Sequence, residues 1–210
     1  SKGYDMKLFL ILFLSLSNAF AAYPLILDDS IIQNKNMYFA THTNALALGV
    51  EYKQIKTLRY QVSLFTDTKL TFFKGWSSTG EAHVTFISPP EAKILLKHLT
   101  LDQMNKIALK NDILNADLQV LEVGSASGIS YKGNQSTTFF LIVESQKLRF
   151  IRNEIYQAYL KEDGQAGSFD PNRFFPHITI GFTVDDLHEG NGVIKDIENS
   201  YDDRFRVILH

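Results

Sequence analysis

The sequence predicts an α+β fold made of two antiparallel β-lobes, with helices on the outside and a cleft between the lobes. Two observations lead to this prediction. Strand-like runs, in which β-branched and aromatic residues alternate with polar ones, come in groups separated by helix-like segments. The two halves of the chain also have similar contents, and grouped strands with segregated helices favour α+β over a doubly wound parallel sheet.

The N-terminal half is expected to form an antiparallel meander that follows one strand and one helix. Clean alternation of apolar and polar residues over 58–65 predicts a strand, and Asp67 begins a short turn after it. The expected elements are an extended lead-in at 23–36, strands at 37–41, 58–65, 70–76 and 81–87, and a helix within 44–57.

The C-terminal half is expected to combine further strands with helices. Thr100 and Gln103 form a capping box that predicts a helix start, and apolar residues follow at helical spacing. Segment 136–144 is the most β-prone run of the chain. The remaining expected elements are a strand at 118–123, a flexible Ser-rich loop at 124–128, a helix at 147–161, a polar loop at 162–172, a second histidine strand at 175–182, a helical region at 185–200 broken at 190–192, and a last strand at 204–209.

The first 22 residues are expected to be a secretory signal peptide rather than part of the fold. Lys7 precedes an apolar run at 8–16, and Ala19 and Ala21 form an A-x-A ending. The run is too short for a transmembrane helix, which needs roughly 20 residues. The alternative is a buried amphipathic helix, and residues 1–5 are either a remnant or a longer basic start. We therefore expect a single domain at 23–210 in a secreted or periplasmic protein with no stable membrane span.

Charge and cysteine content exclude several classes of function. The formal net charge is −2, and it becomes −3 once the charged residues of the signal segment are removed. Such a chain lacks the basic surface that long nucleic acids require, so a small or short phosphodiester fits better. The chain has no cysteine, which excludes disulfides, thiolate catalysis and Cys-ligated zinc. We expect a monomer.

One tripeptide pattern occurs twice in expected strands. His83 is followed at the second position by Thr85, and His177 is followed in the same way by Thr179. Positions i and i+2 share one face of a strand, so each histidine points the same way as its threonine, while the residues between them point to the apolar side. If the two strands lie side by side, two imidazoles and two hydroxyls converge on one spot.

These two motifs resemble those of the 2H phosphoesterase superfamily, which includes cyclic phosphodiesterases and 2′-5′ RNA ligase-like proteins. That family is defined by two H-x-[ST]-x motifs far apart in the chain, and segment 173–182 is very similar to its second motif. The resemblance extends from Met37 to the C-terminus. It implies a bilobal fold with pseudo-twofold symmetry, in which each lobe directs one H-x-T motif into a central groove.

Two histidines that flank a phosphodiester form a chemically sensible acid–base pair. His83 and His177 are the catalytic candidates: one activates water or a ribose hydroxyl and the other protonates the leaving oxygen. The sequence does not decide which is the base. The hydroxyls of Thr85 and Thr179 can hold the non-bridging oxygens, and the mechanism needs no metal and no other cofactor. Further candidates for substrate binding, each with a structural alternative in the core, in an ion pair or in solvent, are Lys74, Trp76, Tyr131 and Arg173.

The sequence thus favours a metal-independent phosphodiesterase for a nucleotide or short oligonucleotide. Cyclic phosphates, 2′-5′ linkages, cyclic dinucleotides and RNA 3′ ends are all compatible substrates, so a role in RNA processing is among the expectations. A metallohydrolase is the weaker alternative because no H-E-x-x-H motif accompanies the histidines. The second alternative is an exported nucleotide-binding module without catalysis. His188 and His210 are expected at the surface.

Overall fold

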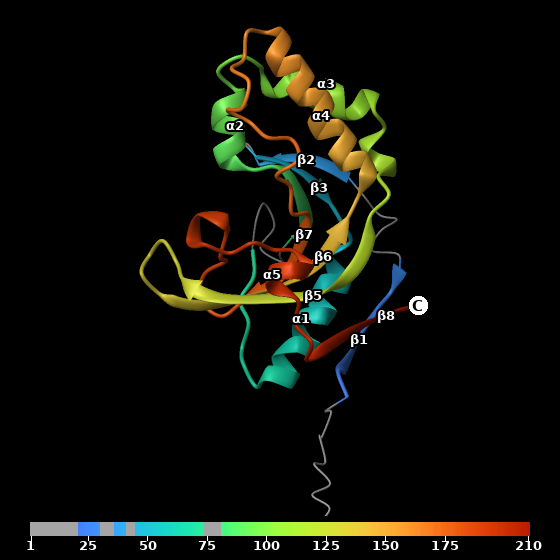
Figure 1. Cartoon of the computed structure of the whole chain (residues 1–210). Coiled ribbons are helices and arrows are strands. Elements are labelled where there is room, and N and C mark those ends of the chain that lie inside the picture. The colour runs from blue at the N-terminus through green and yellow to red at the C-terminus, as the bar shows by residue number, and fades with distance from the viewer. Residues whose placement is uncertain (1–20, 30–35, 41–44, 74–80) are drawn as a thin grey trace, which may run out of the picture.

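A central antiparallel sheet organises the molecule in our computed structural model, which describes residues 21–29, 36–40, 45–73 and 81–210 (Figure 1). Six strands form this sheet in the order β2-β3-β4-β7-β6-β5, and β1 pairs with β8 in a separate parallel ribbon. The strands are β1 (Tyr23–Leu27), β2 (Asn36–Ala40), β3 (Ala45–Gly49), β4 (His83–Ile87), β5 (Gln119–Ile129), β6 (Gln135–Glu144), β7 (His177–Phe182) and β8 (Phe205–Leu209).

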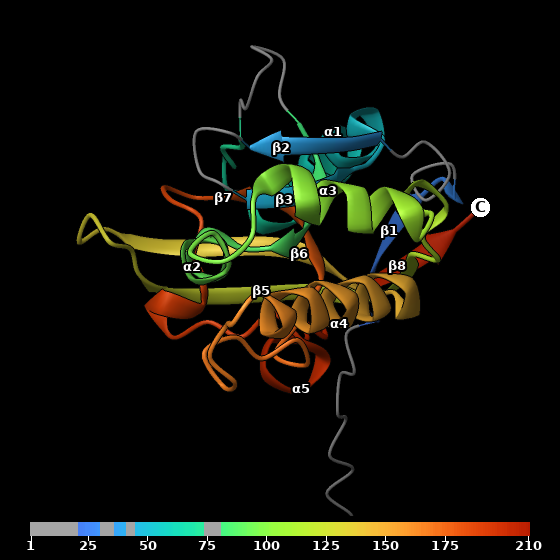
Figure 2. The same cartoon turned by 90° about the horizontal axis from the view of Figure 1, so that it is seen from above.

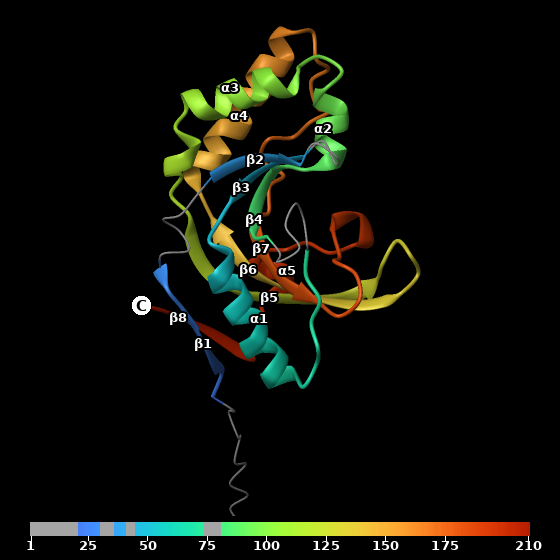
Figure 3. The same cartoon turned by 180° about the vertical axis from the view of Figure 1, so that it is seen from behind.

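Helices pack at two places around this sheet. Figure 1 shows α3 and α4 at one end of the molecule, Figure 2 shows them side by side, and Figure 3 shows α1 near the β1–β8 ribbon. The helices are α1 (Tyr52–Thr66), α2 (Pro89–Leu95), α3 (Leu101–Lys110), α4 (Gln146–Lys161) and α5 (Ile197–Ser200), with 3₁₀ turns at η2 (Ile113–Asn115) and η3 (Glu189–Asn191). In the described part of the chain, no helix combines the length and apolarity that crossing a bilayer requires.

The α+β class is confirmed, but the pseudo-twofold bilobal arrangement is not. The two groups of strands join into one sheet, because the β2-β3-β4 half meets the β7-β6-β5 half at a short ladder between β4 and β7. Several predicted elements are confirmed with small boundary shifts. They are the strands β2, β4, β6, β7 and β8, the helix α4, and the helix α3 with its Thr100–Gln103 capping box.

The predicted meander is wrong, because residues 58–65 belong to helix α1 instead of a strand. Ile55, Leu58 and Val62 are fully buried and follow helical spacing, whereas Tyr60 and Leu64 are mostly exposed. The apolar residues that alternate as in a strand thus also form one face of a helix, and this face packs against the core. The helix predicted within 44–57 is correspondingly wrong at its start, where β3 lies.

The predicted strand at 70–76 is reduced to one isolated bridge between Thr71 and Phe182 within the described residues. Lys74 and Trp76 lie outside the described residues. Of the lead-in predicted at 23–36, residues 23–27 are extended and form β1, which pairs with the last strand β8 in parallel, and residues 30–35 lie outside the described residues. The helical region expected at 185–200 contains only the short turn η3 and the single-turn helix α5.

The loop predicted at 124–128 is instead part of β5, which pairs with β6 in a long hairpin. Glycine at position 124 serves close packing, because the Phe140 ring of the partner strand lies over it. A Cβ atom at Gly124 would lie 2.3 Å from Cε2 of Phe140 and 3.0 Å from the carbonyl oxygen of Ser200. At Gly128 the nearest atom to such a Cβ is 3.6 Å away, which is ordinary contact.

Gly124→Ala should therefore lower the free energy of unfolding by about 1–3 kcal/mol, because the added methyl displaces the buried Phe140 ring. Gly128→Ala is the matched control and should change it by less than about 0.5 kcal/mol. Urea unfolding of both variants measures the difference. Equal stability of the two variants would show that the ring over Gly124 moves without cost.

Candidate active site

The two H-x-T motifs lie on neighbouring strands at the centre of the sheet. Strands β4 and β7 run antiparallel, and Val84 is paired with Ile178. In an antiparallel ladder centred on this pair, His83 lies opposite Thr179 and Thr85 lies opposite His177. The four side chains therefore form a square, with the histidines on one diagonal and the threonines on the other.

Alternate residues of both strands separate this square from the core. Val84, Phe86, Ile178 and Ile180 are fully buried on the core side. The motif histidines and threonines are only partly buried on the opposite face. The apolar residues hold the two strands in register, because a slip by one residue would turn the histidines into the core.

The hydrogen bond of His177 determines its tautomer. Its Nδ1 lies 2.8 Å from the carbonyl oxygen of Phe175, and a carbonyl can only accept, so Nδ1 carries the proton. Nε2 is then a free base, and the ring rests edge-on against Phe140 with 5.8 Å between centroids. Burial, followed by the positive charge of Lys195, lowers the pKa of His177 to about 3.

His83 has a different neighbour, a carboxylate. Its Nδ1 lies 3.5 Å from Oε1 of Glu81, and its ring centroid lies 6.0 Å from that of Phe73. Burial lowers the pKa of His83, and the Glu81 carboxylate opposes that change because it favours the imidazolium. The two motif histidines are thus electrostatically unequal.

A buried ion pair supports the second motif, and sequence reasoning missed it. The Nζ of Lys195 donates to Oδ1 of Asp186 at 3.0 Å, and each side chain is only 3% exposed. Lys195 also lies 5.2 Å from the centroid of the Phe140 ring that contacts His177. The only sequence signal for Asp186 as a site residue is its position shortly after the second motif strand. Nothing in the sequence points to Lys195.

The carboxylate of Asp186 also contacts other polar side chains near the second motif. It accepts hydrogen bonds from the hydroxyl of Thr138 at 2.5 Å and from that of Thr179 at 3.2 Å. His188 is exposed, as expected, yet its Nε2 lies 3.8 Å from Oδ2 of Asp186. The side chain of Thr85 makes no hydrogen bond to another described residue. The two threonines, like the two histidines, therefore differ in their surroundings.

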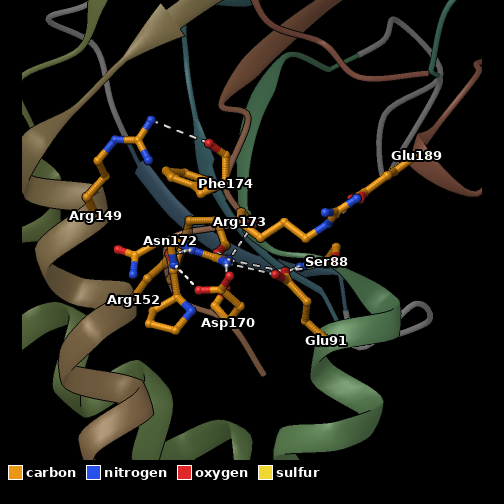
Figure 4. Close-up of polar contacts among 11 residues, drawn as sticks. Ser88, Glu91, Arg149, Arg152, Asp170, Asn172, Arg173, Phe174 and Glu189 are labelled. Carbon is orange, nitrogen blue, oxygen red and sulfur yellow. Dashed lines mark hydrogen bonds and ion pairs between the residues drawn. The ribbon is translucent and has the colours of Figure 1, made fainter. Parts of the chain in front are cut away.

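The remaining predicted substrate-binding residues lie around this centre. Arg173 is largely exposed and forms an ion pair with Glu189 at η3, rather than with the side chain of Asp170 (Figure 4). Tyr131 is 75% exposed at the tip of the β5–β6 hairpin, where its hydroxyl packs closely against Gly190. Both residues therefore reach the 189–191 turn.

Arg152 on α4 links the surroundings of both motifs, and sequence reasoning missed this residue as well. Its guanidinium is almost fully buried and donates to the Phe86 carbonyl, one residue after Thr85, at 2.7 Å. It also forms an ion pair with Glu91 at 2.8 Å. Its other acceptors are carbonyls of the segment that leads into β7, those of Asp170, Pro171 and Arg173 (Figure 4).

No group of three or more His, Asp or Glu side chains among the described residues is arranged to hold a metal ion. The square offers instead two imidazoles and two hydroxyls around one spot, with a buried ion pair beside one corner. Such groups can accept and donate protons on opposite sides of a bound anion.

Comparison with known families agrees with this geometry. The model of the family described as Swiss Army Knife, 2H phosphoesterase domain, matches residues 44–188, which is more than half of the chain and includes both motifs. The chain therefore belongs to this 2H phosphoesterase family, and it is a hydrolase of the 2H type. No curated protein and no solved structure shows significant similarity to it.

Arg152→Met should lower the free energy of unfolding by about 3–5 kcal/mol, because it leaves Glu91 and four carbonyls without their buried donor. Arg149→Met, one turn earlier on the same helix, is the control. Arg149 is paired with Glu144 but is about one-third exposed, so its loss should cost about 1 kcal/mol or less. Urea unfolding compares the two variants, and equal losses would contradict a central role for Arg152.

Proposed function

We propose that the protein is a metal-independent phosphodiesterase that hydrolyses a cyclic, 2′-5′ or 3′-5′ phosphodiester of a nucleotide or short RNA. The observation that carries this proposal is the diagonal placement of His83 and His177 on paired strands. In-line displacement at phosphorus needs a base and an acid on opposite sides of the phosphate. A phosphate centred on the square has one imidazole on each side.

We assign the base to His177 and the acid to His83. His177 presents an unprotonated Nε2, because its Nδ1–H is held by the Phe175 carbonyl. The nearby Lys195 further disfavours a charged His177, whereas Glu81 favours a charged His83. His177 is then neutral while His83, beside the carboxylate, carries the proton, which is the combination that the reaction requires.

The remaining candidate residues surround the phosphate in this proposal. The Thr85 hydroxyl, which has no hydrogen-bond partner among the described residues, can donate to a non-bridging oxygen. Arg173 and Tyr131 flank the 189–191 turn. There the guanidinium can bind a second phosphate of the substrate, and the aromatic ring can stack on a nucleobase. Lys74 and Trp76 stay sequence-based candidates for the same tasks. The expected signal peptide supports a secreted or periplasmic location.

His83→Ala and His177→Ala should each reduce kcat by about 10²–10⁴-fold, because each removes one proton-transfer group. Substrates to assay are 2′,3′-cyclic mononucleotides, 2′-5′ dinucleotides and cyclic dinucleotides, with products followed by phosphorus NMR in the presence of EDTA. His98→Ala is the control, because His98 lies before α3 and contacts the Glu162 carbonyl instead of the motifs.

Full activity in either motif variant would contradict the proposal. Loss of wild-type activity in EDTA, with recovery on adding a divalent metal, would favour a metallohydrolase. Tight nucleotide binding without hydrolysis of any substrate would favour the exported binding module.

The pH profile of kcat/KM should be bell-shaped, with its optimum on the acid side of pH 6.5. Activity rises as His177 loses its proton, near pH 3, and falls as His83 loses its own below pH 6.5. Glu81→Gln removes the charge that favours the His83 imidazolium, so it should move the descending limb to lower pH. An optimum above pH 7, or no movement of that limb, would reject the assignment of roles.

A further inference from the structure

A third imidazole, that of His188, lies beside the square formed by the two motifs. Its Nε2 is 3.8 Å from Oδ2 of Asp186, and the hydroxyl of Thr179 is 3.2 Å from the same oxygen. These two distances place the Nε2 of His188 and the Thr179 hydroxyl at most about 7 Å apart. The charge of His188 also lowers the pKa of both His83 and His177. The ring is therefore close to the groups that act on the phosphate in the proposed function.

The Nε2 of His188 carries a proton that a ligand can reach. Burial alone would raise the pKa of Asp186, but the charge of Lys195 holds it below its ordinary value, so the carboxylate is ionised. A carboxylate attracts an N–H and repels a lone pair, so Nε2 is protonated in the neutral ring as well as in the charged one. At 3.8 Å the contact is too long for a hydrogen bond. The His188 side chain is 51% exposed, against 3% for Asp186, so a ligand can accept this proton.

The charges around the square leave His188 uncompensated. Lys195 is paired with Asp186, and Arg173 is paired with Glu189. The proposed acid also has a carboxylate beside it. Asp186 lies near His188, but its charge is already balanced by Lys195 at 3.0 Å. Among these described groups, His188 is the donor whose positive charge an anionic ligand would complete.

We propose that His188 binds the substrate phosphate by donating a hydrogen bond from Nε2 to one non-bridging oxygen. This inference rests on the proposed function and adds a substrate-binding residue to it. Two donors that hold different oxygens of one phosphate lie up to roughly 8 Å apart, because each hydrogen bond is about 2.8 Å long. His188 and Thr179 are close enough to share a phosphate in this way. His188 transfers no proton in this role, so the base and the acid stay His177 and His83.

Two substitutions at His188 separate hydrogen bonding from shape. His188→Phe keeps a ring of similar size without an N–H, and His188→Gln keeps an N–H near the position of Nε2. Inorganic phosphate is assayed as a competitive inhibitor of 2′,3′-cyclic mononucleotide hydrolysis by the full chain. Its inhibition constant should rise about 3–30-fold in His188→Phe and stay within about 3-fold of wild type in His188→Gln. Both variants should unfold at the urea concentration of the wild type, because the side chain is half-exposed. If His188→Phe does not fold, His188→Ala takes its place.

Sulfur substitution in the substrate gives a readout that is independent of the amount of folded enzyme. The two diastereomers of a 2′,3′-cyclic phosphorothioate each carry sulfur in place of one non-bridging oxygen, and sulfur is the weaker hydrogen-bond acceptor. For one diastereomer, the loss of kcat/KM caused by sulfur should be about 3–30-fold smaller in His188→Phe than in the wild type, because the contact is already absent. For the other diastereomer the loss should be unchanged. His98→Ala, which lies away from the motifs, is the control that should alter neither loss.

The outcomes distinguish this inference from the proposed function. An active His188→Phe variant with the inhibition constant and the sulfur effects of the wild type would overturn the inference and leave the phosphodiesterase intact. Equal rises of the inhibition constant in His188→Phe and His188→Gln, with unchanged sulfur effects, would also overturn it, because His188 would then act through Asp186 alone. A wild-type protein that hydrolyses no phosphodiester would overturn the proposed function and this inference with it.

Discussion

The pairing of β4 with β7 is the constraint on which the rest of the molecule depends. A single residue pair, Val84 with Ile178, sets the register at the point where the two halves of the sheet meet. Because side chains alternate along a strand, the apolar residues of both strands point inward, and the histidine and threonine of each motif point to the opposite face. The apolar residues of the motifs thereby specify the relative position of the polar ones.

Two buried arginines hold β7 from opposite ends. Arg152 binds the carbonyls of the segment that leads into β7, and Arg59 on α1 donates from Nε to the Ile180 carbonyl at 2.7 Å. Each guanidinium also lies over aromatic rings, so its charge is compensated by carbonyl dipoles and π faces as well as by Glu91 in the case of Arg152. Arg59 attaches α1 to β7, and Arg152 attaches α4 to the segment that leads into β7. In the proposed reaction, rigid support of this kind keeps His177 in position.

The two motifs are similar in sequence and different in electrostatics. His83 has a carboxylate beside it, whereas His177 has a carbonyl on one nitrogen and a buried ammonium behind the Phe140 ring. A phosphodiester cleavage is itself asymmetric, since one side receives a nucleophile and the other releases a leaving group. In the proposed reaction, the environment of each histidine suits one of these two tasks, although the tripeptides alone are interchangeable.

Local pattern was sufficient to predict the motif strands, the α3 capping box and the α+β class, because period-two alternation and helix capping depend on residues close together in the chain. It failed for 58–65, where the same apolar residues satisfy a strand and a helical stripe, and only packing against the core distinguishes them. Likewise, Asp186, Lys195 and Arg152 act through contacts with residues distant in sequence. The sequence by itself therefore determined which groups could perform the chemistry, while the tertiary structure alone decided how they are placed, charged and oriented relative to one another.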